Sequence, residues 1–259
     1  MQSVDINGVR LEVRQIPGGP FPPLVFLHEG LGSVALWQGR DGFWPEAVCT
    51  ATGRPGLVWS RRGYGQSDPV PDVRDAGRLQ PDYMHREAWE VLPALLAQLG
   101  IVRPVLLGHS DGGSIALLHA SRHPVEACIV MAPHVIVEEV SVRSIEQARE
   151  AFESGGLRER LARYHADVDG AFWQWNDIWL SPAFRSFDIR EDCRRISAPV
   201  LALQGEDDVY GTLRQIEEIA PTSGPFRMEV IAACGHSPHR DQPALTTRLV
   251  AQFLAGLSR

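Results

Sequence analysis

The sequence has few cysteines and no apolar run long enough to cross a membrane. Its four cysteines (Cys49, Cys128, Cys193 and Cys234) are widely scattered and show no C-x-x-C spacing. This pattern argues against a metal site and against a disulfide framework, and it fits a reducing cytoplasm. The first residues lack the basic start and apolar core of a signal peptide. We therefore expect a cytoplasmic protein with no bound metal and no membrane association.

Basic runs are also absent. The 259 residues carry a formal net charge of −7, so we expect neither a nucleic acid nor an anionic membrane as a partner. The hydrophobic fraction of 44% and the charged fraction of 22% are typical of a globular protein. This length fits one sizeable domain, with or without an insertion. The sequence leaves open whether the protein is a monomer or a homodimer.

Short, continuous apolar runs recur along the chain and predict buried strands. They lie at residues 24–27, 56–60, 105–107, 127–132, 199–203 and 226–231. Helix-compatible stretches separate them, at residues 36–52, 84–99, 113–120, 212–220 and 243–257, with a kink expected at Pro93. Asn7-Gly8 predicts an N-terminal hairpin. This order predicts an α/β fold with a mostly parallel twisted sheet and helices on both faces.

The strand–helix rhythm stops between residues 134 and 195, where no buried strand is evident. Charged amphipathic stretches at 144–153 and 157–165 predict helices, and an aromatic cluster follows that includes Trp173, Trp175 and Trp179. We interpret 134–195 as a helical cap inserted into a core formed by 1–133 and 196–259. Most of these aromatic residues should form the core of the cap itself. One or two of the three tryptophans are expected to face a substrate pocket.

One motif stands between the run at 105–107 and the helix-like stretch at 113–120. It reads Gly108-x-Ser110-x-Gly112, in the strand–turn–helix setting that gives the pattern its meaning. The small glycines permit a turn so tight that the serine hydroxyl lies exposed at the tip of a strand. N–H groups of the following helix then face whatever the serine attacks. Ser110 is the predicted nucleophile.

A serine needs a base, and the base needs an orienting acid. Loops at the carboxyl ends of late strands offer both, because function gathers at that edge of an open α/β sheet. Three carboxylates, Glu206, Asp207 and Asp208, follow the run at 199–203, and His236 follows the last run. The resulting order of serine, acid and histidine is the one expected for a nucleophile on such a sheet.

With these motifs the chain resembles the α/β-hydrolase superfamily over nearly its whole length. The matching segments are His28-x-Gly30-x-Gly32, Arg62-Gly-x-Gly-x-Ser67, Gly108-x-Ser110-x-Gly112, Gly205-x-x-Asp208 and Gly235-His236. Together they are specific to the fold but not to a substrate. The chain is most similar to capped bacterial members, which include carboxylesterases, enol-lactonases and carbon–carbon bond hydrolases.

The resemblance implies a role for several residues. It selects Asp208 as the acid of the triad, with Asp207 as the alternative, and it assigns the oxyanion hole to the backbone N–H groups of Gly30 and Asp111. It implies no cofactor. The chain departs from the family pattern at Glu29, where a glycine usually follows the histidine. This carboxylate either points to solvent or, with Asp111, disfavours anionic substrates.

We therefore expect a serine hydrolase that cleaves a small ester or lactone through an acyl-enzyme on Ser110, with His236 as base and Asp208 as its partner. One alternative is a hydrolase of a carbon–carbon bond in a vinylogous diketone, which uses the same triad. A basic residue for the substrate carboxylate would favour it, and Arg185 and Arg190 are candidates. Another alternative is a non-catalytic ligand receptor. Epoxide hydrolase and dehalogenase chemistry are disfavoured, because those relatives use an aspartate nucleophile.

Overall fold

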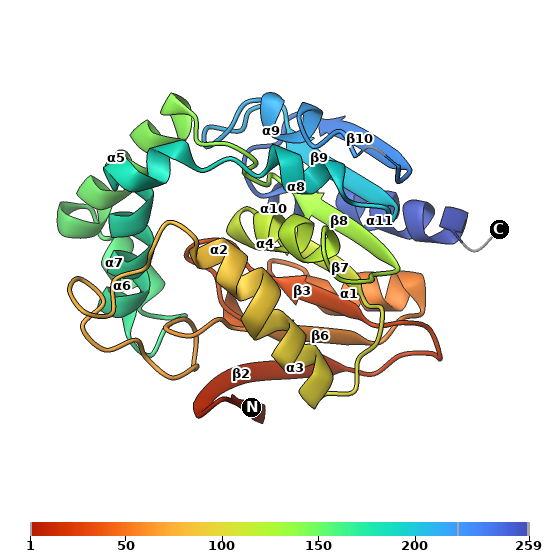
Figure 1. The fold of residues 1–259 in the computed structure, drawn as a ribbon, viewed down its shortest axis with the longest axis horizontal. Coiled ribbons are helices and arrows are strands. Elements are labelled where there is room, and N and C mark those ends of the chain that lie inside the picture. Colours follow the sequence, from red (N-terminus) through yellow and green to blue (C-terminus); the bar gives the residue numbers. More distant parts are fainter. Residues whose placement is uncertain (1, 222, 258–259) are drawn as a thin grey trace.

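The structure, a computed structural model, describes residues 2–221 and 223–257. Its centre is an eight-stranded sheet in the order β1-β2-β6-β3-β7-β8-β9-β10 (Figure 1). The strands are β1 (Gln2–Ile6), β2 (Val9–Ile16), β3 (Leu24–Leu27), β6 (Gly56–Trp59), β7 (Val105–His109), β8 (Ala127–Met131), β9 (Val200–Gly205) and β10 (Phe226–Ile231). Only β1 and β2 run antiparallel to their neighbours. The prediction of a mostly parallel sheet is confirmed.

The predicted N-terminal hairpin is present. β1 and β2 pair antiparallel, with Ile6 opposite Val9. Asn7 and Gly8 both have positive φ, 54° and 82°, as a two-residue turn of type I′ requires. The hairpin adds two antiparallel strands at one edge of the sheet.

Helices cover both faces of the sheet. α1 (Trp44–Thr52) and α11 (Pro243–Leu257) pack together against one face, where Phe26, Leu107 and Phe253 belong to one apolar core. On the other face lie α3 (Leu92–Gln98), α4 (Asp111–Ala120) and α8 (Arg190–Arg194), and a second core forms around Leu106 and Ile115. The central strands are buried throughout and mostly apolar, because helices cover both of their faces.

The helix predicted at 36–52 is shorter than expected. A 3₁₀ turn (Ala35–Trp37) is followed by a small hairpin of β4 (Gln38–Gly39) and β5 (Gly42–Phe43), and α1 begins only at Trp44. Pro45 stands in the first turn of α1, where proline is tolerated, because its missing N–H has no helical partner there. Gly42, with φ of 124°, takes a conformation that a helix does not allow.

The helix predicted at 84–99 is present but interrupted, as its proline indicates. α2 (Tyr83–Arg86) continues through a π-helical turn (Glu87–Val91) into α3, and Pro93 lies in the first turn of α3. Proline offers no N–H to the carbonyl one turn back. The wider π turn takes up this break in the hydrogen-bond ladder.

Residues 134–195 form helices, as predicted. They are α5 (Glu139–Ser154), α6 (Leu157–Leu161), α7 (Val168–Trp179), a 3₁₀ turn (Pro182–Ser186) and α8. α5 is longer than the predicted 144–153, and α6 ends earlier than the predicted 157–165. Within this described segment the only β pairing is an isolated bridge between Ile136 and Asp188. Elsewhere, the helix predicted at 212–220 is shorter than expected, since α9 covers only Arg214–Glu217. The short helix α10 (Pro238–Asp241) was not predicted.

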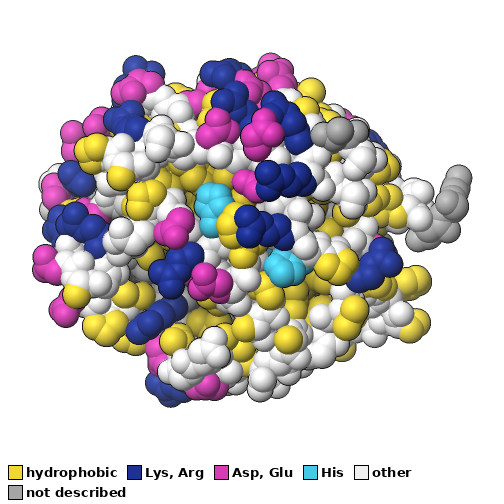
Figure 2. Space-filling view, viewed as in Figure 1, with side chains coloured by type: hydrophobic (Ala, Val, Ile, Leu, Met, Phe, Trp, Pro, Cys, Tyr) yellow, Lys and Arg dark blue, Asp and Glu magenta, His cyan; other side chains and the backbone are white. Residues whose placement is uncertain are grey.

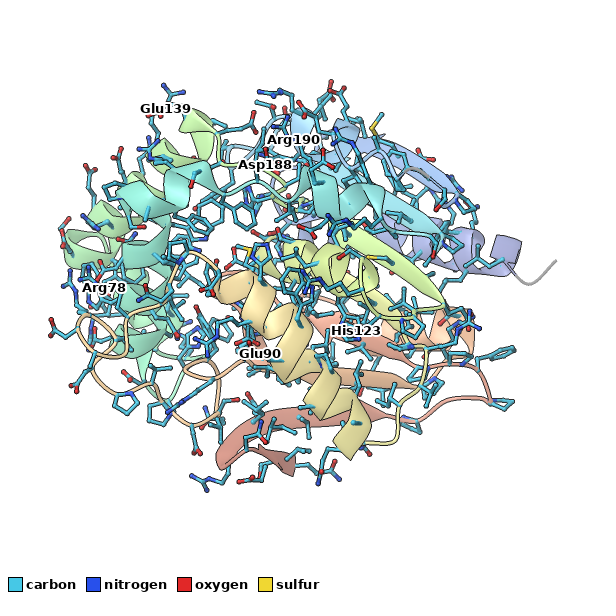
Figure 3. The ribbon with its side chains drawn as sticks, viewed as in Figure 1. Arg78, Glu90, His123, Glu139, Asp188 and Arg190 are labelled. Carbon is cyan, nitrogen blue, oxygen red and sulfur yellow. The ribbon has the colours of Figure 1, made fainter. Side chains whose placement is uncertain are left out.

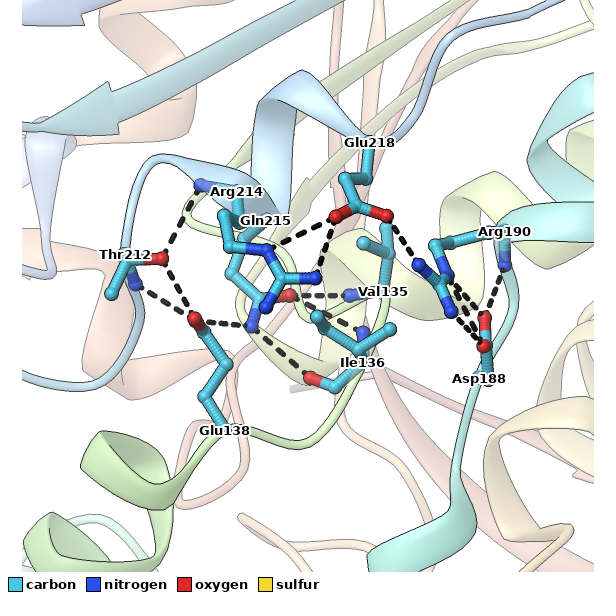
Figure 4. Close-up of polar contacts among 9 residues, drawn as sticks. All are labelled: Val135, Ile136, Glu138, Asp188, Arg190, Thr212, Arg214, Gln215 and Glu218. Carbon is cyan, nitrogen blue, oxygen red and sulfur yellow. Dashed lines mark hydrogen bonds and ion pairs between the residues drawn. The ribbon is translucent and has the colours of Figure 1, made fainter.

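The two ends of the helical segment are fixed to the core beside α9 (Figure 4). Gln215 accepts hydrogen bonds from the backbone N–H groups of Val135 and Ile136 and donates to the Glu138 carboxylate at 2.7 Å. At the other end, Arg190 donates to Asp188 and to Glu218. Entry and exit are therefore joined to the same short helix, which lies just beyond the loop that carries Asp208.

The surface carries charges of both signs. On the face in Figure 2, acidic and basic side chains are intermingled over α5, α6 and α7 and along the upper rim. Several form ion pairs, including Arg158–Asp169 and Arg185–Glu139. In the described part of the chain, no helix is both long and apolar enough to cross a bilayer.

Glu87 in the π turn generates a prediction about stability. Burial raises its pKa from 4.5 to about 7, although Arg61 opposes this. A carboxyl group with a raised folded-state pKa stabilises the fold most below its unfolded pKa and loses that contribution as the pH rises through the folded value. Relative to Glu87→Gln, the wild-type free energy of unfolding should fall by about 1–3 kcal/mol between about pH 4.5 and pH 7.

Urea unfolding of both proteins at several pH values checks this expectation. The exposed Glu90→Gln variant, in the same turn, is the matched control and should track wild type. If the free energy of unfolding of wild type and of Glu87→Gln changed with pH in the same way, Glu87 would not have a raised pKa in the folded protein.

Candidate active site

The turn between β7 and α4 holds Ser110 in a strained backbone conformation. Ser110 has φ of 53° and ψ of −120°, a region that residues other than glycine rarely adopt. Its N–H donates to the Met131 carbonyl of the neighbouring strand at 2.9 Å. Glycine is required two residues before and two residues after Ser110. A Cβ on Gly108 would lie 2.1 Å from the Gly112 carbonyl oxygen, and one on Gly112 would lie 2.2 Å from the Leu27 carbonyl oxygen.

Ser110, His236 and Asp208 form one hydrogen-bonded line. His236 Nε2 lies 3.0 Å from Ser110 Oγ, and His236 Nδ1 lies 2.9 Å from both carboxylate oxygens of Asp208. The Asp208 side chain is 1% exposed and that of His236 is 16% exposed. A carboxylate accepts only, so Nδ1 carries the proton and Nε2 is free to accept from the serine hydroxyl. The three predicted residues are thus brought together from β7–α4, β9 and β10.

Asp208, rather than its neighbours, faces the histidine. Gln204 Nε2 donates to Asp208 Oδ2 at 2.6 Å and the Tyr210 N–H donates to Oδ1 at 2.8 Å. Burial alone would raise the pKa of Asp208, but the hydrogen bonds from His236 and from the Tyr210 N–H lower it below 3.8. Glu206 and Asp207 are exposed on the same loop. Asp208 therefore stays ionised at neutral pH and holds the imidazole.

The loop after β3 is held from beneath by Arg61, which is 3% exposed. The Arg61 guanidinium donates to the carbonyl oxygens of His28 and Glu29. The Arg61 N–H donates to His28 Nε2, and His28 Nδ1 lies 2.6 Å from the Glu29 carbonyl oxygen. Burial lowers the pKa of His28 well below 6.5, so its neutral ring bonds only to backbone. This arrangement fixes the position of Gly30.

Gly30 and Asp111 line the same cavity as Ser110. Asp111 is the first residue of α4, where backbone N–H groups have no partner within the helix. Gly30 lies directly under the indole of Trp175, since a Cβ there would be 2.1 Å from Trp175 Nε1. The two residues assigned to an oxyanion hole therefore both border the space in front of the serine.

The Glu29 side chain does not point to solvent. It is 15% exposed, and its Oε2 lies 3.4 Å from His109 Nδ1, while Arg240 approaches Oε1 at 3.5 Å. Burial alone would raise the pKa of Glu29, but His109 and Arg240 hold it well below 4.5. The opposite ring atom, His109 Nε2, lies 2.7 Å from the backbone carbonyl oxygen of His236. Glu29 is thus connected through one imidazole to the backbone of the predicted base.

The cavity in front of Ser110 has a volume of about 200 Å³ and mainly apolar walls. The helical segment contributes Ile145, Trp175 and Trp179, and the loop after Asp208 contributes Tyr210. Of the three tryptophans proposed for the pocket, Trp175 and Trp179 line this cavity and Trp173 does not. Trp173 lies against Phe172, with Arg74 4.0 Å above its ring. Trp175 and Trp179 are four residues apart and share a helix face, whereas Trp173 points away from it.

The charged groups in the cavity wall are acidic. Among the residues that the structure describes, Glu29 and Asp111 line it and no arginine does. Asp111 is 1% exposed; Tyr83 donates to its Oδ2 at 2.6 Å, and Arg61 lies 3.9 Å from that atom. Burial raises the pKa of Asp111, although Arg61 and Tyr83 oppose this. Of the histidines, burial lowers the pKa of His134 to about 3, so that ring is neutral.

The arginines considered for a substrate carboxylate lie elsewhere. Arg185 pairs with Glu139 at 2.9 Å. Arg190 pairs with Asp188, and Figure 3 labels these two side chains next to each other near the top of the view. Among the described residues, no group of three His, Cys, Asp or Glu side chains could hold a metal ion.

Sequence reasoning missed several cavity residues. Ile145, His134 and Tyr210 have no motif, and each is brought to the cavity by packing of the helical segment or of the Asp208 loop. Only for Tyr210 could the sequence have suggested a place at the cavity, because it lies two residues after the predicted acid, Asp208. Ser141 and Ser144 of α5 hold that loop by donating to the carbonyl oxygens of Tyr210 and Val209.

Known proteins resemble this chain over most of its length. The sequence profile of the Alpha/beta hydrolase family matches residues 24–249. The chain is 26% identical over 284 residues to the mouse sn-1-specific diacylglycerol lipase ABHD11, covering 98% of this chain and 88% of that protein. It is 32% identical over 269 residues to the mouse serine hydrolase BPHL, covering 97% and 85%.

Solved structures share the fold. The enol-lactonase of Burkholderia xenovorans LB400 superposes with a TM-score of 0.74 at 22% identity, covering 98% of this chain and all of that one. The meta-cleavage product hydrolase of Pseudomonas fluorescens IP01 gives a TM-score of 0.72 at 17% identity, covering 99% and 98%.

The contact between Glu29 and His109 generates a second prediction. Glu29→Ala should lower kcat about ten- to a hundredfold with a smaller change in KM, because His109 loses the carboxylate that orients it against the His236 backbone. Glu29→Gln keeps the shape and a polar partner for Nδ1, so it should retain most activity. Steady-state kinetics on a chromogenic ester measures both constants.

The exposed Glu206→Gln variant is the control for loss of one carboxylate near the site. Thermal unfolding of each variant separates a kinetic effect from a folding defect. A folded Glu29→Ala protein with wild-type kcat would show that this contact does not position the histidine.

Proposed function

Because this chain belongs to the alpha/beta hydrolase family, we propose that it is a serine hydrolase that cleaves a small ester or lactone through an acyl-enzyme on Ser110. The observation that carries the proposal is the line from Ser110 Oγ to His236 Nε2 at 3.0 Å and from His236 Nδ1 to Asp208 at 2.9 Å. Nucleophile, base and orienting acid lie within hydrogen-bond reach of one another, as this chemistry requires.

In the first step, Ser110 Oγ attacks the substrate carbonyl carbon while His236 Nε2 takes the hydroxyl proton. The carbonyl electron pair moves onto oxygen, and the N–H groups of Gly30 and Asp111 stabilise that charge. Collapse of the intermediate expels the alkoxide, which takes the proton from His236, and the acyl group remains on Ser110. Asp208 holds the ring in the required tautomer and stabilises the transient imidazolium.

In the second step, water replaces the alcohol. His236 takes a proton from water, the resulting hydroxide attacks the acyl carbon, and Ser110 leaves with the proton returned by His236. The chemistry needs neither metal nor cofactor. The helical segment of residues 134–195 acts as a cap in this proposal, because Trp175 and Trp179 form the wall opposite Ser110.

The cavity supports an uncharged substrate with a small acyl group. Its volume of about 200 Å³ is below the range of drug-sized sites, and its aromatic wall suits an apolar group. The Glu29 carboxylate, whose pKa is held well below 4.5, would repel a substrate carboxylate in a site of low dielectric constant. This charge weighs against the carbon–carbon bond hydrolase. Neither Arg185 nor Arg190 lines the cavity, where a substrate carboxylate would need a basic partner.

Hydrolysis of p-nitrophenyl acetate, butyrate and octanoate tests the activity. We expect turnover of the two shorter esters, a clear preference over octanoate, and a loss of about three orders of magnitude or more in Ser110→Ala. Labelling by a fluorophosphonate should be abolished in the same variant. Labelling of a folded protein that turns over no ester would instead support the receptor alternative.

A matched pair of substrates tests the charge of the pocket. p-Nitrophenyl butyrate and mono-p-nitrophenyl succinate have similar size but differ by one carboxylate. We expect kcat/KM to favour the butyrate by about a hundredfold. Glu29→Gln, which removes the charge but keeps the shape of the side chain, should narrow this ratio by about tenfold, whereas Glu206→Gln should leave it unchanged. Equal kcat/KM for both esters in wild type would refute the charge argument.

A further inference from the structure

β10 forms an edge of the sheet with an apolar character. It pairs with β9 on one side, and no described strand pairs with its outer side, at the upper right of Figure 1. Phe226, Met228 and Val230 are 36%, 42% and 43% exposed. The opposite edge, β1, instead exposes polar side chains, those of Gln2, Ser3 and Asp5. The two edges of one sheet therefore differ in chemistry.

An unpaired strand offers a row of free N–H and C=O groups to another strand. Natural proteins commonly protect such edges with charges, proline or bulges. β10 instead carries three large apolar side chains on one face and one pair of opposite charges, Arg227 and Glu229, on the other. This pattern suits a strand that is covered by a partner.

The hydrogen bonds to β9 determine which backbone groups are free. The Pro225 carbonyl accepts from the Val200 N–H, and the Ile231 carbonyl accepts from the Glu206 N–H. Since the direction of these groups alternates along a parallel strand, odd-numbered residues of β10 point toward β9. The N–H and C=O groups of Phe226, Met228 and Val230 therefore point outward.

These directions limit how β10 could pair with itself. In an antiparallel pair, outward-pointing residues must oppose one another, which leaves registers centred on Arg227, Met228 or Glu229. A centre at Arg227 or at Glu229 places like charges directly opposite, which is destabilising. A centre at Met228 places Arg227 opposite Glu229 of the second copy, and Phe226 opposite Val230. Only this register complements both the charges and the apolar side chains.

We propose that β10 pairs antiparallel with β10 of a second copy of this chain, centred on Met228, so that the two sheets become continuous across a twofold axis. Each copy donates three N–H groups, from Phe226, Met228 and Val230, giving six hydrogen bonds in all. Arg227 and Glu229, already 2.7 Å apart within one strand, become part of a cluster of four charges. Residues 226–230 are complementary in charge and shape to the same residues of a second copy, and for this reason we propose a second copy as the partner.

The interface is small, so we expect a reversible dimer with a dissociation constant of about 1–100 µM. Sedimentation velocity at loadings from about 1 to 300 µM should show a concentration-dependent shift from monomer to dimer. A charge reversal at either position, Arg227→Glu or Glu229→Arg, places like charges opposite one another and should weaken the dimer at least tenfold. Ser3→Glu, on the β1 edge, is the matched control and should dimerise as wild type does.

Mixing the two reversed variants is the decisive experiment. Each alone carries two like charges on β10 and should stay monomeric. In a mixed pair, every charge at 227 or 229 again opposes its opposite, so a heterodimer should form with about wild-type affinity. Circular dichroism of each variant verifies that it is folded. A wild-type protein that stays monomeric at 300 µM, or folded variants that fail to combine, would overturn the proposal.

Discussion

The strained turn at Ser110 is the constraint on which the other parts of the site depend. A serine with φ of 53° persists only where its surroundings hold it. Here a hydrogen bond to β8 and the close contact of two glycines with β3 and α4 backbone supply that support. This conformation places the Ser110 hydroxyl at the end of a central strand, within reach of His236 and next to the start of α4. Neighbouring loops only have to reach this one point.

Buried polar groups, rather than exposed ion pairs, bring those loops into place. Arg61 binds the backbone of the loop that carries Gly30. Gln204 and the backbone of Tyr210 orient Asp208, and two serines of α5 hold the same loop from the other side. A buried donor or acceptor without a partner is costly, so these networks determine the loop conformations closely. The helical segment thus takes part in the geometry of the acid as well as in the cavity wall.

The charge of the site follows from the same burial. Asp208 has strong hydrogen-bond partners and keeps a lowered pKa, whereas Asp111, one residue beyond the nucleophile, is buried with weaker compensation and has a raised pKa. Glu29 stands beside His109 and Arg240 and remains ionised. Three carboxyl groups within one small region therefore experience different environments, and this difference separates the orienting acid from the groups that shape the cavity.

The sequence by itself determined the sheet, its parallel strands, the turn at Ser110 and the order of serine, acid and histidine. Each of these depends on local patterns: continuous apolar strands, glycines at fixed spacing, and polar residues where strands end. It did not determine where the 36–52 helix begins, which tryptophan faces the cavity, or where Glu29 points.

Those outcomes depended on contacts between residues far apart in the chain. Trp173 and Trp175 are nearly equivalent in sequence, and only the packing of α7 against the core separates them. Glu29 is turned inward, where His109 Nδ1 and the Arg240 guanidinium, from distant segments, lie close to its carboxylate. Tertiary structure decides such cases because the free energy of burying a side chain depends on the partners that it meets there, and local sequence does not specify those partners.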